Sequence, residues 1–229
     1  MRKWIRFASV VVMVICTGVL INYFYSYIKV EKELESAQQI VETSKLETLQ
    51  QQNKKIIGWL SLEDSRLNNP VLQTDNNEFY LKHNYLNQSS RGGSIFVDYR
   101  NDALYDRHTI FYGHVLRNGS MFGELAKFSD QQYATEHPVF IYETNDKTYT
   151  LEVFAAYETT TDFYYLETDF TDDTFGQFLT TIQSQSVIEM PVEVSEQDQI
   201  VTFSTCTTSA DDIERFVVHA KVIPQEPTE

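Results

Sequence analysis

The amino-acid sequence predicts a mainly β fold: a closed or partly closed barrel of seven to eight strands with peripheral helices, preceded by a helical stalk and one transmembrane helix. Three observations predict this arrangement. The chain begins with a long apolar run, a polar stretch without glycine or proline follows it, and short β-type runs separated by turn residues begin at residue 56. The 14 tyrosines and 15 phenylalanines also favour β-structure.

Residues 1–28 have the pattern of a cytoplasmic tip and a transmembrane signal anchor. Three basic residues precede a run over residues 8–28 that contains no charged side chain. This run is long enough to cross, as a helix, a hydrocarbon layer about 30 Å thick. The basic residues predict an N-terminus in the cytoplasm and an extracellular remainder, in a single-pass protein of the cell membrane. A cleaved signal peptide is the alternative, but the aromatic ending NYFYSYI suits a membrane interface better than a cleavage site.

Net charge narrows the class of partner. The chain of 229 residues carries −15 at pH 7, and its first 28 residues carry three positive charges and no negative ones, so the remainder carries −15 − 3 = −18. An extracellular part of this charge argues against nucleic acid or anionic lipid as its partner.

Residues 29–55 predict a helical stalk. This stretch is rich in Glu, Gln, Lys and Ser, and its apolar residues recur at loosely helical spacing. The spacing is too irregular for a coiled-coil dimer, so we expect the stalk to pack on its own domain.

Residues 56–229 are expected to form the extracellular domain. IIGWLSL and NPVLQ flank a turn at Asp64–Ser65, and VFIYET and KTYTLEVFAAYETT form a hairpin. The other predicted strands are SIFVDY, HTIFYGH, QIVTFSTC and RFVVHAKVI. The helices expected between them cover residues 76–82, residues 120–128 with Ser120 as a cap, and a segment through Gln185 capped by Asp172 or Asp173.

The two cysteines indicate a reactive thiol. Cys16 lies within the apolar run and Cys206 far into the extracellular domain, so they cannot pair within one chain. A single thiol outside the membrane is reactive or intermolecular, unless it is buried and inert. One thiol with scattered histidines does not have the spacing of a zinc site, so no metal and no cofactor is expected.

Strand order brings a cation toward this thiol. If QIVTFSTC and RFVVHAKVI are neighbouring antiparallel strands, Cys206 ends the first and Arg215 begins the second. Residues 216, 218, 220 and 222 form one apolar face, so Arg215 points away from the core toward a groove. Its guanidinium can donate forked hydrogen bonds to an oxyanion. A solvated surface arginine is the alternative.

His114 is the candidate acid or base because it ends a strand beside a glycine-containing loop. His83 and His137 lie in polar stretches typical of surfaces, and His108 lies at the opposite end of its strand. His219 is about 13 Å from Arg215 along the strand, too far for both to serve one small centre.

These segments resemble those of the sortases, the cysteine transpeptidases of Gram-positive cell surfaces. TFSTC is similar to the family's T-L-x-T-C strand with Phe203 in place of Leu, RFVVHAKV to its arginine strand, and YGH with NGSMFGEL to its histidine region. The resemblance covers residues 56–223. Within the family, the chain is most similar to class B, and this similarity is carried by VDYRN, NGSMF and the helix expected before Gln185. The lid and the second membrane segment of class C are not seen in the sequence.

The resemblance implies a catalytic domain over residues 56–229 with Cys206 as nucleophile, His114 as acid and base, and Arg215 as oxyanion donor, while Ser204 and Thr205 contact substrate. It implies cleavage of an LPxTG- or NPxTN-like sorting signal after Thr, a thioacyl enzyme, and transfer of the surface protein to an amine of a peptidoglycan precursor. No cofactor is implied.

Three alternatives stay open at this point. A class B-like pilin polymerase would use a pilin lysine as the amine, and a secreted cysteine peptidase would release the acyl group to water. A membrane-tethered binding module would use none of these residues for catalysis.

Overall fold

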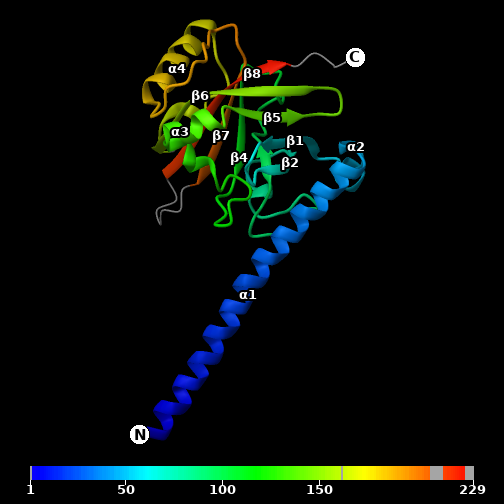
Figure 1. Ribbon diagram of the computed structural model, residues 1–229, viewed down its shortest axis with the longest axis vertical. Coiled ribbons are helices and arrows are strands. Elements are labelled where there is room, and N and C mark those ends of the chain that lie inside the picture. Colours follow the sequence, from blue (N-terminus) through cyan, green and yellow to red (C-terminus); the bar gives the residue numbers. More distant parts are fainter. Residues whose placement is uncertain (1, 161, 207–213, 225–229) are drawn as a thin grey trace.

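In the computed structural model, which describes residues 2–160, 162–206 and 214–224, eight strands close into a barrel in the order β1-β2-β3-β4-β7-β8-β6-β5 (Figure 1). The predicted barrel is confirmed, and it is closed. Its strands are β1 (Ile56–Leu62), β2 (Asn68–Leu72), β3 (Ile95–Val97), β4 (His108–Gly113), β5 (Val139–Glu143), β6 (Thr148–Thr160), β7 (Ile200–Cys206) and β8 (Glu214–Pro224).

Two of the pairings are parallel, β2 with β3 and β4 with β7, and the others are antiparallel. The β4–β7 pairing positions the site. Because the two strands are parallel, their C-terminal ends lie side by side, with Gly113 opposite Thr205. The antiparallel β8 then begins at the same end of the barrel.

The barrel interior is filled by aromatic and branched side chains. In the centre, the Phe203 ring packs against the tilted rings of Phe111 and Phe140, with centroids 5.4 and 4.4 Å apart. The predicted apolar face of β8 does face this core, where Phe216 and Val218 are buried. The parity argument for this strand is therefore confirmed.

A second apolar layer lies outside the barrel. Helix α4 (Asp172–Gln185) packs Phe175, Phe178 and Ile182 against the outer faces of β6 and β8. The prediction of Asp172 or Asp173 as its cap is wrong. Thr171 is the cap, because its hydroxyl accepts from the Thr174 amide while the Thr174 hydroxyl accepts from the Thr171 amide, which satisfies two exposed donors at once.

The remaining short helices lie in the connections. The predicted helix over residues 76–82 contains η1 (Phe79–Leu81), but the one predicted over 120–128 begins later, as η2 (Leu125–Ser129). Ser120 does not cap it, since its hydroxyl donates to the Asn118 side chain instead. The others are α3 (Gln131–Glu136) and η3 (Tyr164–Leu166).

The N-terminal segment is one helix, α1 (Arg2–Thr43), followed by the short α2 (Leu46–Gln52). The C-terminal part of α1 packs on the barrel through Val30, Leu34 and Ala37, which follow the helical spacing of one face. The N-terminal part extends away from the domain with its apolar side chains exposed, and it is long and apolar enough to cross a membrane.

Candidate active site

The C-terminal ends of β4 and β7 and the N-terminal end of β8 lie together at one end of the barrel. Cys206 ends β7 and is paired with Arg215 of β8. Gly113 ends β4 opposite Thr205, so the next residue, His114, lies at the same end. The sheet register therefore brings together three residues that are far apart in the sequence.

A pocket of about 220 Å³ opens beside this end of the barrel. Ser204, Thr205 and Arg215 line it on the β7–β8 side, and Tyr112 and Leu166 are among the apolar and aromatic residues of its other walls. The buried Ser204 hydroxyl is hydrogen-bonded to the hydroxyl of Tyr165, another wall residue, at 3.1 Å. The pocket lies beside the end of β7 that carries Cys206.

The imidazole of His114 is fixed through one of its two nitrogens. Its Nε2 lies 2.8 Å from the carbonyl oxygen of Leu81, which can only accept, so Nε2 carries a proton. Gly93 lets the adjacent turn pass this close: it has φ +57°, and a Cβ there would lie 2.9 Å from the Leu81 oxygen and 3.1 Å from His114 Cδ2. Nδ1 is the nitrogen left to exchange a proton.

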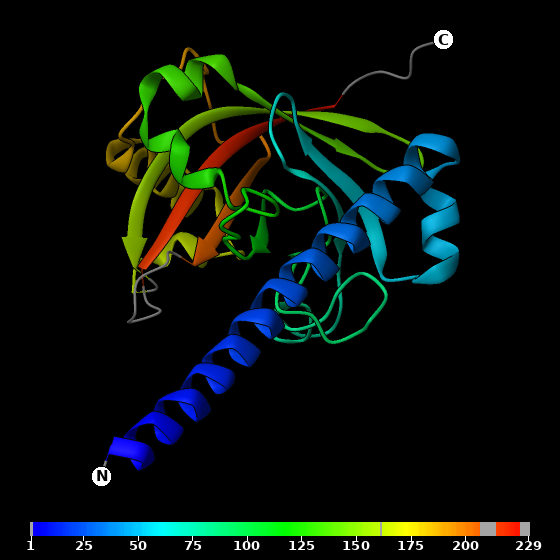
Figure 2. The same ribbon diagram turned by 60° about the horizontal axis from the view of Figure 1, so that its bottom comes forward.

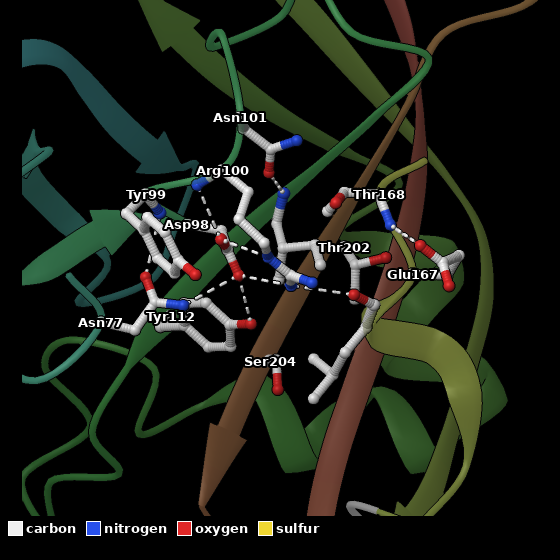
Figure 3. Close-up of polar contacts among 12 residues, drawn as sticks. Asn77, Asp98, Tyr99, Arg100, Asn101, Tyr112, Glu167, Thr168, Thr202 and Ser204 are labelled. Atoms are coloured by element: carbon white, nitrogen blue, oxygen red, sulfur yellow. Dashed lines mark hydrogen bonds and ion pairs between the residues drawn. The ribbon is translucent and has the colours of Figure 1, made fainter. Parts of the chain in front are cut away.

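A buried carboxylate braces the pocket (Figure 3). Asp98 is fully buried and accepts hydrogen bonds from Arg100 at 2.8 and 2.9 Å, from the Tyr112 hydroxyl at 2.9 Å and from Asn77 Nδ2 at 2.9 Å. Burial acts to raise the pKa of Asp98, but the hydrogen bonds and charge of Arg100 outweigh it and hold the pKa below its usual value. Arg100 also donates to the Leu166 carbonyl at 2.9 Å.

The sequence offered only a weak signal for this brace. VDYRN stood out as a motif, but nothing in it shows that Asp98 contacts Asn77, Tyr112 and, through Arg100, Leu166. All three partners line the 220 Å³ pocket, so Asp98 connects three of its walls.

Two fully buried histidines form a second network. His108 Nδ1 donates to the Glu167 carbonyl at 2.6 Å, so its Nε2 accepts from the Thr202 hydroxyl at 2.6 Å. That hydroxyl accepts from His219 Nδ1 at 2.7 Å, and His219 Nε2 accepts from the Tyr157 hydroxyl at 2.9 Å. Burial of both rings, which lowers the pKa of each histidine, favours this arrangement with both imidazoles neutral. Neither histidine could be assigned this role from the sequence, because their common partner is on a third strand.

The comparisons with known proteins agree with this geometry. The family model of the sortase domain matches residues 60–223. The chain is 45% identical over 181 residues to sortase B of Listeria monocytogenes, covering 78% of this chain and 74% of that protein. The chain belongs to the sortase family.

Solved structures place this sortase in class B. The structure of sortase B from B. anthracis in complex with AAEK1 is 40% identical, with a TM-score of 0.83 over 88% of this chain and 100% of that one. A Staphylococcus aureus sortase B–substrate complex is 34% identical, with a TM-score of 0.76 over 86% and 94% of the two chains. The protein is therefore a class B sortase, and an enzyme of the cysteine transpeptidase type.

The buried histidines make the stability of this sortase sensitive to acid. Burial lowers the pKa of His108 to about 4 and that of His219 well below its usual value. Because the unfolded chain takes up these protons near pH 6.5, stability is fully present above that pH and is lost as pH falls toward about 4. His108 alone accounts for about 3 kcal/mol of this loss. Thermal unfolding at pH values across this window should show a falling Tm; a flat profile would contradict the neutral pair.

Removing the Asp98 carboxylate should destabilise the sortase barrel. Asp98→Ala leaves Arg100, Tyr112 and Asn77 without their shared acceptor, and we expect a loss of about 3 kcal/mol. This corresponds to a fall in Tm of roughly 10 °C. Asp146→Ala, an exposed carboxylate in the β5–β6 turn, is the matched control and should leave Tm nearly unchanged. Equal effects from the two variants would show that the Asp98 network does not stabilise the fold.

Proposed function

We propose that this class B sortase cleaves a sorting signal of the LPxTG or NPxTN kind after Thr and transfers the surface protein to an amine of a cell-wall precursor. The observation that supports the proposal is the register of β4, β7 and β8: His114, Cys206 and Arg215 lie at one end of the barrel, beside a pocket of about 220 Å³.

In the first step, the Cys206 thiolate attacks the Thr carbonyl carbon, and the carbonyl oxygen becomes an oxyanion. Arg215 donates to that oxyanion, since a guanidinium stays charged at any working pH. His114 gives a proton from Nδ1 to the departing amine, the C–N bond breaks, and a thioester on Cys206 remains.

In the second step, the roles reverse. His114 Nδ1, now without its proton, accepts one from the incoming amine, whose nitrogen attacks the thioester carbon. The new amide forms as the C–S bond breaks, and the Cys206 thiolate is regenerated. The Leu81 carbonyl keeps the ring in one orientation through both steps, because it holds the proton on Nε2.

Two solved relatives support the two substrates of this scheme, the acceptor amine and the peptide that is cleaved. One solved sortase B, 34% identical with a TM-score of 0.81, is complexed with triglycine, a peptide with a free amine, and another is a substrate complex. For this chain we propose Ser204 and Thr205 as substrate contacts, since both line the pocket.

We propose further that α1 anchors the enzyme in the cell membrane with its N-terminus inside and the catalytic domain, residues 56–229, outside. The apolar exposed part of α1 and the three basic residues before it support this orientation. Residues 29–55 then continue the anchor onto the domain as part of α1 and as α2.

The test is mass spectrometry of the full chain in detergent with a panel of sorting-signal peptides. A thioacyl adduct on Cys206 is the expected result, together with a transfer product when a glycine peptide is added as acceptor. Peptide cleavage that no acceptor amine alters would favour a cysteine peptidase. Transfer only to a pilin lysine would favour a pilin polymerase, and no adduct with any peptide would overturn the proposal.

A further inference from the structure

The anchor helix forms a wall beside His114. A pocket of about 170 Å³ lies between α1, through Ser26, Tyr27 and Val30, and the loops that carry Arg91 and His114. The end of the barrel that holds the proposed catalytic residues therefore meets α1 at the point where the charge-free run ends.

The height of this contact relative to a membrane follows from the helix rise. The charge-free run ends at Ile28, and at about 1.5 Å per residue Tyr23 lies about 7.5 Å inside that end. Tyr23 belongs to the aromatic ending NYFYSYI, which is typical of a membrane interface. The guanidinium carbon of Arg91 lies 5.2 Å from the centroid of the Tyr23 ring. With α1 inserted, Arg91 is thus at headgroup level, and Figure 2 shows the helix passing directly along this loop region.

Charge at this level is locally positive, although the domain as a whole is acidic. Arg91 and Arg117 are both exposed; Arg91 lines the 170 Å³ pocket, and Arg117 follows Leu116, another residue of that lining. Nearby cations are neutralised, Lys29 by Glu33 and Arg66 by Glu31. By contrast, in the part of the chain that the structure describes, no carboxylate lies within ion-pair distance of Arg91 or Arg117.

We propose that the loops carrying Arg91 and Arg117 dock on the membrane surface, where the two guanidinium groups bind phospholipid phosphates. The catalytic end of the barrel then faces the bilayer rather than the medium. The inference rests on the proposed membrane insertion of α1. The inference also revises the expectation, drawn from net charge, that the extracellular part does not bind anionic lipid. A net charge of −18 describes the extracellular part as a whole, whereas the point of contact carries two arginines.

The test compares amide hydrogen exchange in the full chain, reconstituted in nanodiscs of phosphatidylcholine with and without phosphatidylglycerol. We expect residues 87–93 and 115–119 to exchange more slowly in the anionic discs. The variant R91Q/R117Q should lose this protection, by about fivefold for each arginine, which corresponds to ~1 kcal/mol per cation at an anionic surface. Lys147→Gln is the control, because the β5–β6 turn lies at the end of β6 remote from Arg215.

The outcomes separate this inference from the anchoring proposal. Rapid exchange throughout residues 8–28 in the discs would overturn both. A protected span with loops that exchange equally in both lipids, and equally in R91Q/R117Q, would overturn the docking surface alone. Slow loop exchange that the double variant does not change would overturn the role of the two arginines.

Discussion

Cys206→Ala should abolish transpeptidation, with a fall in kcat/KM of at least about a thousandfold. The alanine side chain has no nucleophilic atom, and water cannot replace the thiolate within the thioacyl mechanism. Turnover of a sorting-signal peptide with a glycine-peptide acceptor, followed by chromatography of both the cleaved and the transferred product, measures the effect.

The matched control for this variant is Cys16→Ala. Cys16 is an exposed residue of α1, and its loss should leave the turnover of the peptide unchanged. Equal Tm values for the three proteins would show that the fold is intact. A Cys206→Ala enzyme that keeps a tenth of the wild-type rate would refute the assignment of the nucleophile.

Arg215→Lys should lower kcat/KM by about 10²- to 10³-fold, the loss typical when one oxyanion donor is removed. The charge is kept, but an ammonium cannot reproduce the planar fork of a guanidinium, so the oxyanion loses directed hydrogen bonds. Because the oxyanion forms only during the reaction, the loss should appear mainly in kcat, which steady-state kinetics over a range of peptide concentrations can show.

Arg107→Lys provides a comparison for the same chemical change elsewhere. Arg107 precedes β4 at the end remote from Gly113 and lies over the ring of Phe175 in the outer layer. Its replacement should leave both kcat and KM unchanged. If Arg215→Lys changes KM alone, Arg215 binds the substrate peptide without stabilising the transition state.

The barrel, and the face of its last strand β8 that packs in the core, could be predicted from the sequence. Alternating apolar residues in β8 identified that face correctly, because strand parity is a local property that burial enforces. Phe216 and Val218 are buried as expected, and Arg215 lines the groove. Family motifs supplied the association of His114 with Cys206, which depends on a parallel pairing of strands remote in sequence.

Contacts between remote segments could not be predicted. Asp98 and Arg100 lie in a motif that was visible in the sequence, yet their partner Asn77 comes from the segment before η1 and their partner Leu166 from η3. The cap of α4 was misassigned for a local reason. The sequence prediction considered Asp172 and Asp173 only, whereas the reciprocal bond to Thr174 selects the adjacent Thr171.

The unbroken course of α1 from Arg2 to Thr43 has a consequence for how this sortase meets its substrates. A flexible linker would let a catalytic domain sample a hemisphere above the membrane. If α1 is inserted as proposed, a stiff helix that is also packed on the barrel leaves only lateral diffusion and rotation about the membrane normal. The search for substrates in the same bilayer then becomes two-dimensional, and its rate depends on their surface density. Proteins already released into the medium would be poor substrates, whatever their sorting signal.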